Sequence, residues 1–276
     1  MEDYSEFVPN VHFELIPIKN LVSNQDYQRS LSSSHISRTA KNFDLYQINP
    51  VKVSRRDGIN YVFNGQHTVE IVAEVSQSRD TPVWCMIYDD MDYETEADVF
   101  ANQQKFIKAL SPYEIFQANI EAGNNQQMAI KALVESYGLE ISNKKTPKNI
   151  CAISSLEYIY GKYGLKNLDR TLKLCIATWE GEPNSLSSSM LKGIAYLVAC
   201  YGDNMLDEVF KEKLSACTAK EISRTAKDRK AGPIGYAEAM LTVYNKKMRT
   251  GLKWSELYTG KKISVEKTEQ LEEAEA

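Results

Sequence analysis

Five polar or small residues in the first quarter of the chain, Asn64, Gly65, Gln66, His67 and Thr68, could together bind an anion. The three residues before them are typical of a strand, and the apolar residues after them recur at helical spacing. Asn-Gly is a turn signal, and glycine permits a positive φ and the close approach of another group. The first N–H groups of a helix lack partners and its dipole favours anions, so a phosphate group fits there. A turn that only caps a helix is the alternative interpretation.

Further residues are candidates for the same kind of site. Arg29 ends a polar loop, and a guanidinium suits bidentate contact with phosphate, although a surface arginine without a role is the alternative. Asn102 and Gln103 are amides on an otherwise apolar helical face, where they either contact a ligand or serve as hydrogen-bonded structural residues. His12 and His35 have no supporting context, and we expect them to be structural.

A cluster of basic residues with few acids between them lies in the last quarter of the chain. Its members are Lys211, Lys213, Lys220, Arg224, Lys227, Arg229 and Lys230. A charge run is usually a solvated face, but the last five of these residues are candidates for neutralising DNA phosphates. The pattern closest to a helix-turn-helix has helices over residues 130–137 and from about residue 148, joined by a ten-residue break that is longer than the motif needs.

Composition excludes several classes of protein. The 276 residues are 43% hydrophobic and 25% charged, as in ordinary soluble proteins, and suffice for one large domain or two ordinary ones. The net charge of −4 gives no overall attraction to nucleic acid, so binding it requires a local basic patch. The acidic N-terminus does not look like a signal peptide, and the apolar runs are too short to span a bilayer. We therefore expect a cytoplasmic protein without a membrane partner.

The cysteines and histidines show no metal-binding pattern. Five dispersed cysteines without a C-x-x-C pair predict reduced, buried thiols. The three histidines are too far apart for zinc-ligand spacing, and the sequence contains no H-E-x-x-H motif of a metallohydrolase.

The elements that must hold these residues change character along the chain. Before residue 90 the patterns predict a strand over 11–22 interrupted by Pro17, a short helix to 40, a strand at 51–53, the strand and helix around the polar turn, and a buried strand at 82–88. From residue 93 onward only helical periodicity remains. We therefore predict an α+β domain over residues 8–110, an all-α helical domain over 111–260, and an acidic disordered tail over 261–276.

The order of the N-terminal elements, with several short motifs, resembles the ParB/sulfiredoxin superfamily. Y-Q-R ending at Arg29 resembles the first ParB box, and N-P-V-K-V at residues 49–53 resembles the strand that follows it. The polar turn stands where ParB has a phosphate-binding G-E-R-R turn. It is closer to the D-G-Q-H-R signature of a related group, and it also resembles the F-G-G-C-H-R nucleotide turn of sulfiredoxin. Residues 110–114 resemble the L-x-P-x-E start of the ParB helical domain, so the similarity covers about residues 12–135.

The sequence departs from these relatives at several positions. Gln66 replaces the catalytic cysteine of sulfiredoxin, so sulfinic-acid reduction is not supported, and Thr68 replaces the second basic residue of the turn. The E-N-x-x-R element of ParB, which holds metal and phosphate, appears here with Ala101, Asn102 and Lys105 at its three defined positions. The loss of the glutamate counts against metal-assisted hydrolysis, because magnesium prefers carboxylate and phosphate oxygens.

The resemblance implies that the ligand is a nucleoside triphosphate, ATP or CTP, bound together with Mg²⁺. It also implies that Asn102 contacts the metal ion. The nucleotide-binding residues that it implies are Arg29, Asn64, Gly65, Gln66, His67, Thr68, Asn102 and Lys105. The implied function is that of a nucleotide-binding, DNA-associated protein of a partition, DNA-modification or mobile-element system, with homodimerisation left open.

Whether the protein is an enzyme, such as a nucleoside triphosphatase or nuclease, is also left open. Two alternatives stand beside the leading hypothesis. One is an ATP-dependent kinase or nucleotide hydrolase that acts on a small molecule or protein. The other is a non-catalytic regulatory or interaction protein.

Overall fold

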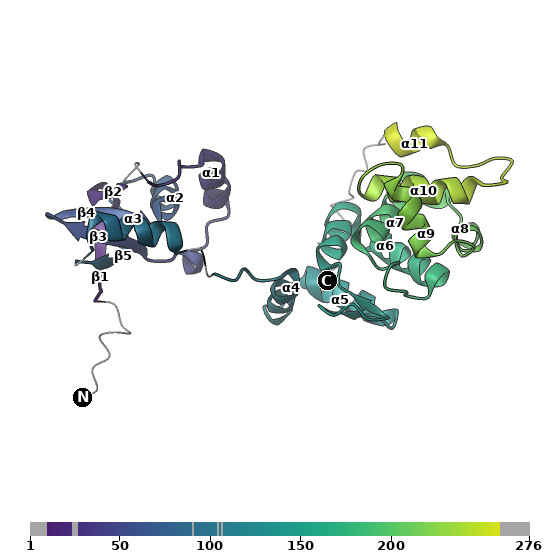
Figure 1. Cartoon of the computed structure of the whole chain (residues 1–276), viewed down its shortest axis with the longest axis horizontal. Coiled ribbons are helices and arrows are strands. Elements are labelled where there is room, and N and C mark those ends of the chain that lie inside the picture. Colours follow the sequence, from purple (N-terminus) through teal and green to yellow (C-terminus); the bar gives the residue numbers. More distant parts are fainter. Residues whose placement is uncertain (1–9, 24–26, 90, 104, 106, 260–276) are drawn as a thin grey trace, which may run out of the picture. The chain divides into compact units, whose positions relative to one another are not determined.

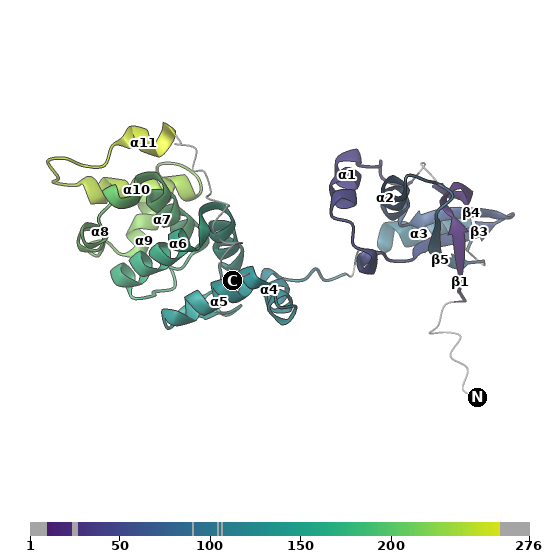
Figure 2. The same ribbon diagram turned by 180° about the vertical axis from the view of Figure 1, so that it is seen from behind.

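The computed structural model describes residues 10–23, 27–89, 91–103, 105 and 107–259 (Figures 1 and 2). The chain forms two compact units, Met1–Lys108 and Ala109–Ala276, each with a hydrophobic core of its own. A mixed sheet lies in the first unit and helices dominate the second, which confirms a protein built from both kinds of structure. The predicted acidic tail lies outside the described residues.

The first unit is built on a five-stranded mixed sheet. Its strands, in spatial order, are β1 (His12–Pro17), β5 (Pro82–Tyr88), β3 (Val51–Arg56), β4 (Ile59–Asn64) and β2 (Leu21–Ser23). β1 pairs antiparallel with β5 and β3 antiparallel with β4, whereas β3 with β5 and β2 with β4 are parallel pairs. The hairpin β3–β4 therefore lies at the centre of the sheet and ends at the polar turn.

The segment predicted as one interrupted strand forms two strands at opposite edges of the sheet. A 3₁₀ turn, Ile18–Asn20, separates β1 from β2. Pro17 ends β1 because it has no N–H to donate, and the following Ile18 N–H bonds to the carbonyl of Thr81 at 3.1 Å instead. Ile18 is fully buried, so the crossing anchors the chain in the core.

Helices lie on both faces of this sheet. They are α1 (Ser33–Lys41), α2 (Gln66–Ser76) and α3 (Tyr93–Asn102), and α1 packs against α2. Val69 of α2 joins the core formed by one face of the strands, which includes Val51 and Val53. Alternation along β3 sends Ser54 and Arg56 to the other face, where they contact the segment containing α3. The end of β4 therefore lies between α2 and α3.

The second unit is a bundle of helices around a large apolar core (Figure 1). The helices are α4 (Pro112–Glu121), α5 (Asn125–Ser136), α6 (Ile153–Trp179), α7 (Ser188–Tyr201), α8 (Asp207–Leu214), α9 (Ala219–Lys227), α10 (Pro233–Asn245) and α11 (Trp254–Thr259). Ser111 and Glu114 form a reciprocal capping box at α4, and Pro112 is its first residue. α6 is interrupted at Gly164, where φ is 80°.

Two short strands contradict the purely helical prediction for this unit. β6 (Glu140–Ile141) and β7 (Asn149–Ile150) form a parallel pair between α5 and α6. The helix expected from about residue 148 is wrong, because Lys148 has a φ of 65° and α6 begins at Ile153. A strand pair between two helices is not the three- or four-residue turn of a helix-turn-helix, so that motif is absent from this stretch of described chain.

The thiols only partly follow expectation. All five cysteines are free, with Cys85 and Cys175 buried, but Cys151 is exposed.

Among the helices of the described chain, none combines the length and apolarity needed to cross a membrane.

Candidate phosphate-binding site

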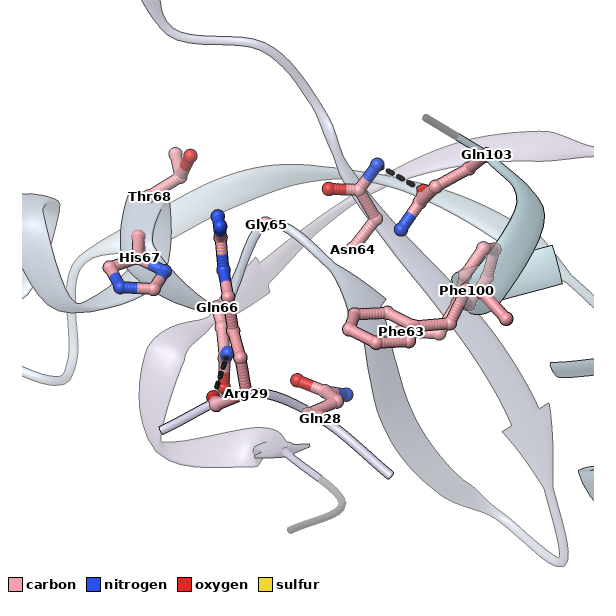
Figure 3. Close-up of a pocket in the computed structure, with 11 residues that line it drawn as sticks. Gln28, Arg29, Phe63, Asn64, Gly65, Gln66, His67, Thr68, Phe100 and Gln103 are labelled. Atoms are coloured by element: carbon pink, nitrogen blue, oxygen red, sulfur yellow. Dashed lines mark hydrogen bonds between the residues drawn. The ribbon is translucent and has the colours of Figure 1, made fainter. Parts of the chain in front are cut away.

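A cavity of about 490 Å³ opens in the first unit where β4 passes into α2 (Figure 3). Its walls come from the loop before α1, from the end of β4, from the first turn of α2 and from the end of α3. The residues that line it are Gln28, Arg29, Phe63, Asn64, Gly65, Gln66, His67, Thr68, Phe100, Ala101 and Gln103. The structure thus brings Arg29 next to the polar turn, as the sequence predicts.

Gly65 makes the sharp entry from β4 into α2. Its φ of 104° and ψ of 13° are left-handed, which disfavours other residues. A Cβ at this position would lie 3.3 Å from the backbone Cα of Val51. The group that approaches the glycine closely is therefore the neighbouring strand β3, and the glycine serves the packing of the turn.

The N-terminus of α2 opens into the cavity with N–H groups that have no partner within the helix. No side chain of the described residues caps this helix, and its first intrahelical hydrogen bond runs from Val69 N–H to Gly65 O at 3.0 Å. The N–H groups of the three lining residues before Val69 precede that bond and have no partner within the helix. This end of the helix carries a partial positive charge that favours an anion.

His67 is held as a neutral hydrogen-bond donor beside this helix end. Its Nε2 accepts the backbone N–H of Ser32 at 3.3 Å, which assigns the proton of the neutral ring to Nδ1. The ring packs edge-on against His35, with 5.4 Å between centroids. Burial, and then the charges of Arg29 and His35, lower the pKa of His67. A bound anion would offset the repulsion from Arg29 and favour the protonated ring, in which the new proton on Nε2 replaces the bond accepted from Ser32.

Arg29 is positioned through its backbone. The amide Nε2 of the buried Gln66 donates to the Arg29 carbonyl at 2.7 Å. The neighbouring Gln28 amide donates to the carbonyl of Val62 in β4. Both bonds fix the loop, while the exposed Arg29 side chain extends toward the start of α2 (Figure 3). Its guanidinium can thus meet an anion bound at the helix end.

The opposite wall is an amide pair. Asn64 Nδ2 donates to Gln103 Oε1 at 2.6 Å, which joins the end of β4 to the residue after α3 (Figure 3). The neighbouring Asn102 does not line the cavity, and its amide donates to the carbonyl and carboxylate of Asp98, at 3.0 and 2.9 Å. Lys105 is also outside the lining. Of the eight predicted nucleotide contacts, the structure therefore gathers six.

A buried ion pair that sequence reasoning missed supports two walls of the cavity. The carboxylate of Glu96 in α3 is fully buried and accepts hydrogen bonds from Arg56 of β3 and from the hydroxyl of Tyr27. Burial and the bond to Glu96 raise the pKa of Tyr27, so its hydroxyl stays protonated. Tyr27 also packs edge-on against Phe100, with 5.3 Å between centroids. Glu96 therefore fastens both α3 and the loop that carries Arg29.

The lining suits phosphate better than a protein-bound metal ion. Within the described part of the chain, no three His, Cys, Asp or Glu side chains form a cluster that could hold a metal. The lining residues supply cationic, amide and backbone donors and no carboxylate. Magnesium prefers oxygen ligands, chiefly carboxylates and phosphates. The residues present do not form a magnesium site, and Asn102 lies outside the cavity.

The five predicted DNA contacts of the basic cluster divide into two groups. Lys220, Arg224 and Lys227 lie along one face of α9 and line a second cavity of about 360 Å³ in the helical unit. Arg229 instead lies over the ring of Trp254, with 5.9 Å from Cζ to the centroid. The Lys230 ammonium lies 3.5 Å from a carboxylate oxygen of the buried Glu238.

The α9 cavity combines cationic side chains with hydroxyl groups. Its remaining lining residues are Asn184, Ser187, Ser223 and Tyr236. None of its three cationic side chains forms an ion pair with a described residue. Ser187 precedes α7, and among the described side chains none caps this helix. Ser223 and Tyr236 share a hydrogen bond of 2.8 Å between their hydroxyl oxygens.

The α9 face has a sequence duplicate in the first unit. The hexapeptide I-S-R-T-A-K occurs at residues 36–41 in α1 and at residues 222–227 in α9. In both helices the isoleucine is buried and the arginine and lysine are exposed. The α1 copy lines neither of the two cavities described above.

Most of the chain matches the model of one protein family. Residues 22–253 match the model of a family described as "Family of unknown function (DUF6551)". The chain belongs to this family. The DUF6551 match includes every residue that lines the two cavities. No curated protein matches this chain.

A search of solved structures finds the C-terminally truncated chromosome-partitioning protein ParB from Caulobacter crescentus, in complex with CTP-gamma-S. It shares 14% sequence identity, and the alignment covers 83% of this DUF6551 chain and 98% of the ParB chain, with a TM-score of 0.35. A similarity of this size carries no argument about the ligand, so the function rests on the site itself.

Proposed function

We propose that the first unit binds the phosphate groups of a nucleoside triphosphate, ATP or CTP. One observation carries this proposal: the uncapped N-terminus of α2 opens into a cavity that also receives Arg29 and His67, and no described residue of its lining is acidic. Backbone N–H groups and the helix dipole favour negative charge, and a guanidinium can contact two phosphate oxygens at once.

The size and the opposite wall of the cavity suit an organic ligand. The volume of about 490 Å³ falls in the range of small-molecule sites, roughly 300–1,000 Å³. Phe100, which is only partly buried, gives apolar surface for a base or sugar, and the Asn64–Gln103 amide pair gives polar groups beside it. Phosphate contact at the helix end would therefore leave room for the rest of a nucleotide.

The lining favours binding over hydrolysis. Hydrolysis or phosphoryl transfer generally uses a protein group to hold magnesium or to orient the nucleophile. The described lining offers no carboxylate for either task. We infer that magnesium, when present, would come with the nucleotide phosphates. A nucleotide-responsive binding protein is therefore favoured over the kinase and hydrolase alternatives.

A calorimetric series tests this proposal. ATP, CTP, inorganic pyrophosphate and cytidine are titrated in turn into the full-length protein, with magnesium present. We expect saturable binding of a triphosphate, weaker binding of pyrophosphate and no measurable binding of cytidine, because phosphate contact supplies the affinity. Equal binding of cytidine and CTP, or no binding of either triphosphate, would overturn the proposal.

A second candidate function is contact with the phosphates of DNA in the α9 cavity. Its support is the set of three cationic side chains without ion pairs to described residues, next to the uncapped start of α7. Lys and Arg that neutralise phosphates give binding that weakens as salt rises.

Three expectations from the sequence remain predictions. They are the assignment to a partition, DNA-modification or mobile-element system, homodimerisation and a cytoplasmic location.

Binding of a labelled duplex, measured by fluorescence anisotropy at several salt concentrations, tests the second function. We expect Arg224→Ala to weaken binding and to reduce the slope of log K against log salt by about 0.9. Arg38→Ala is the matched control, because it changes the same residue of the same hexapeptide in α1. Equal effects of the two substitutions would assign no role to the α9 cavity.

A further inference from the structure

A third cavity, of about 580 Å³, combines aromatic and basic side chains in the helical unit. Its aromatic walls are Tyr158, Tyr163, Tyr196 and Tyr258, and its basic residues are Lys162 and Lys192. The rest of its described lining is apolar, and no carboxylate is part of it. The cavity is therefore positively charged, with ring surfaces around an apolar floor.

Hydrogen bonds hold the outer wall of this cavity in place. The hydroxyl of Tyr196 in α7 donates to the carbonyl of Leu257 in α11 at 2.7 Å, and Leu257 itself is fully buried. The hydroxyl of Tyr258 donates to the carboxylate of Glu238 in α10 at 2.6 Å. α11 packs against α7 at the edge of the unit (Figure 1). Tyr258 is therefore fixed as a wall, while half of its surface remains exposed.

The lysines of the cavity lie against its rings. The Lys192 ammonium is 4.8 Å from the ring centroid of Tyr158, and the Lys162 ammonium is 5.2 Å from the centroids of Tyr158 and Tyr163. Lys162 also donates to the Tyr158 hydroxyl at 2.8 Å, and this bond raises the pKa of Lys162. Burial raises the pKa of Tyr163. At neutral pH Lys162 is therefore charged and Tyr163 is neutral.

We propose that this cavity binds a base of an unpaired nucleic-acid strand, with the base stacked on Tyr158 and the neighbouring phosphates on Lys162 and Lys192. Tyr158 is 43% exposed, so its ring is accessible from solvent. Stacking on aromatic rings beside basic side chains is how single strands are bound without sequence readout. Lysine side chains are flexible, so an ammonium can leave a ring face for a phosphate.

This proposal rests on the nucleic-acid role of the α9 cavity. Residues of α10 line both the α9 cavity and the aromatic cavity. Tyr236 of α10 lines the α9 cavity, and Pro233 and Ile234 of the same helix line the aromatic cavity. Phosphate contacts alone serve single strands and duplexes alike. An aromatic cavity adds affinity only where bases are unstacked, so it would select the unpaired strand.

Fluorescence anisotropy with three labelled ligands of equal length tests the proposal on the full-length protein. The ligands are a thymidine single strand, an abasic single strand that has phosphates without bases, and a duplex. Tyr158→Ala removes the ring, and Tyr158→Phe keeps it. Tyr46→Ala is the control, because Tyr46 is 97% exposed and lies in the other unit. Circular dichroism and thermal melting of each variant verify that the fold is retained.

We expect Tyr158→Ala to weaken binding of the thymidine strand about 5- to 160-fold and to leave the abasic strand and the duplex unchanged. Tyr158→Phe and Tyr46→Ala should bind all three ligands as the wild type does. Equal wild-type affinity for the thymidine and abasic strands would overturn the proposal, and so would equal behaviour of Tyr158→Ala and Tyr46→Ala. Duplex binding that depends on Arg224 can persist in either case, which separates this proposal from the α9 function.

Discussion

The side-chain amide of Gln66 donates a hydrogen bond of 2.7 Å to the backbone carbonyl of Arg29. Gln66 is the first residue of α2, so this bond ties the loop that carries Arg29 to the helix end where an anion would bind. The guanidinium itself remains exposed and able to meet a ligand. The sequence separation of 37 residues between donor and acceptor shows that the site is assembled from distant parts of the first unit.

The lowered pKa of His67 predicts a pH dependence of ligand binding. Burial and the charge of Arg29 disfavour the protonated ring in the free protein, whereas a bound phosphate favours it. Binding therefore takes up a proton, and affinity should rise as pH falls toward the ordinary histidine value of about 6.5. Calorimetric titration of CTP into wild type and His67→Gln between about pH 8 and pH 6 measures this effect.

The ligand phosphate also titrates in this range, but it does so equally with both proteins. The expected result is therefore a steeper pH dependence for wild type than for His67→Gln. His12→Gln is the matched control, since His12 lies on β1 outside the cavity. Parallel pH profiles for wild type and His67→Gln would show that His67 does not contact the ligand.

Gly65→Ala should destabilise the first unit. The new methyl group would lie 3.3 Å from the Val51 Cα, and the φ of 104° is unfavourable for alanine. Together these effects should cost about 2–3 kcal/mol in the free energy of unfolding. Urea denaturation measures the change. Gly58→Ala is the control for backbone conformation alone, because Gly58 has a φ of 78° and its Cβ would meet no atom within 4 Å.

If the two glycine variants lose equal stability, close packing against β3 is not the reason for a glycine at position 65.

Because Gly65 packs against β3, a substitution such as Gly65→Val would disturb the fold and would not report on the ligand site alone. Arg29→Ala is the cleaner probe of binding, because its side chain is exposed and the described hydrogen bond of this residue uses only its backbone.

Glu96→Ala should be strongly destabilising, because it leaves Arg56 without its buried partner. Breaking a buried ion pair from one side costs about 3–5 kcal/mol, and the 22% exposure of the remaining Arg56 side chain places the expected loss at the lower end of that range. The comparison is Glu70→Ala, which breaks an exposed ion pair with Arg79 and should cost about 1 kcal/mol or less. Thermal or urea unfolding of both variants measures the difference. Similar losses in the two would mean that the Glu96 carboxylate does not anchor α3.

The local parts of the fold could be predicted from sequence because their signals are local. The strand, glycine turn and helix around Gly65 depend on periodicity and on one backbone conformation, and both can be read within about a dozen residues. The crossing after Pro17 and the strand pair β6–β7 could not be predicted, because a strand's partner lies elsewhere in the chain. Short strands also lack a periodic pattern of their own.

In the candidate site, too, the residues with local signals could be predicted and those placed by the three-dimensional fold could not. The polar turn and Arg29 were found from residue type, but the placement of Gln103 rather than Asn102 at the cavity depends on the exit direction of α3. One residue along a helix turns the side chain by about 100°. Glu96 gave one available signal, a carboxylate among the apolar positions of a helix, yet its partners Arg56 and Tyr27 could be identified only in three dimensions.

Calorimetric titration of CTP and ATP, each with magnesium, into wild type, Arg29→Ala and His67→Ala measures whether a nucleotide binds with its phosphates at the start of α2. Arg249→Ala, an exposed arginine of the helical unit, is the charge-matched control. We expect saturable binding by wild type and Arg249→Ala, and a loss of about 1–3 kcal/mol in the binding free energy for each of the two site variants. Equal affinity in all four proteins, or no heat of binding with either nucleotide in wild type, would contradict the claim.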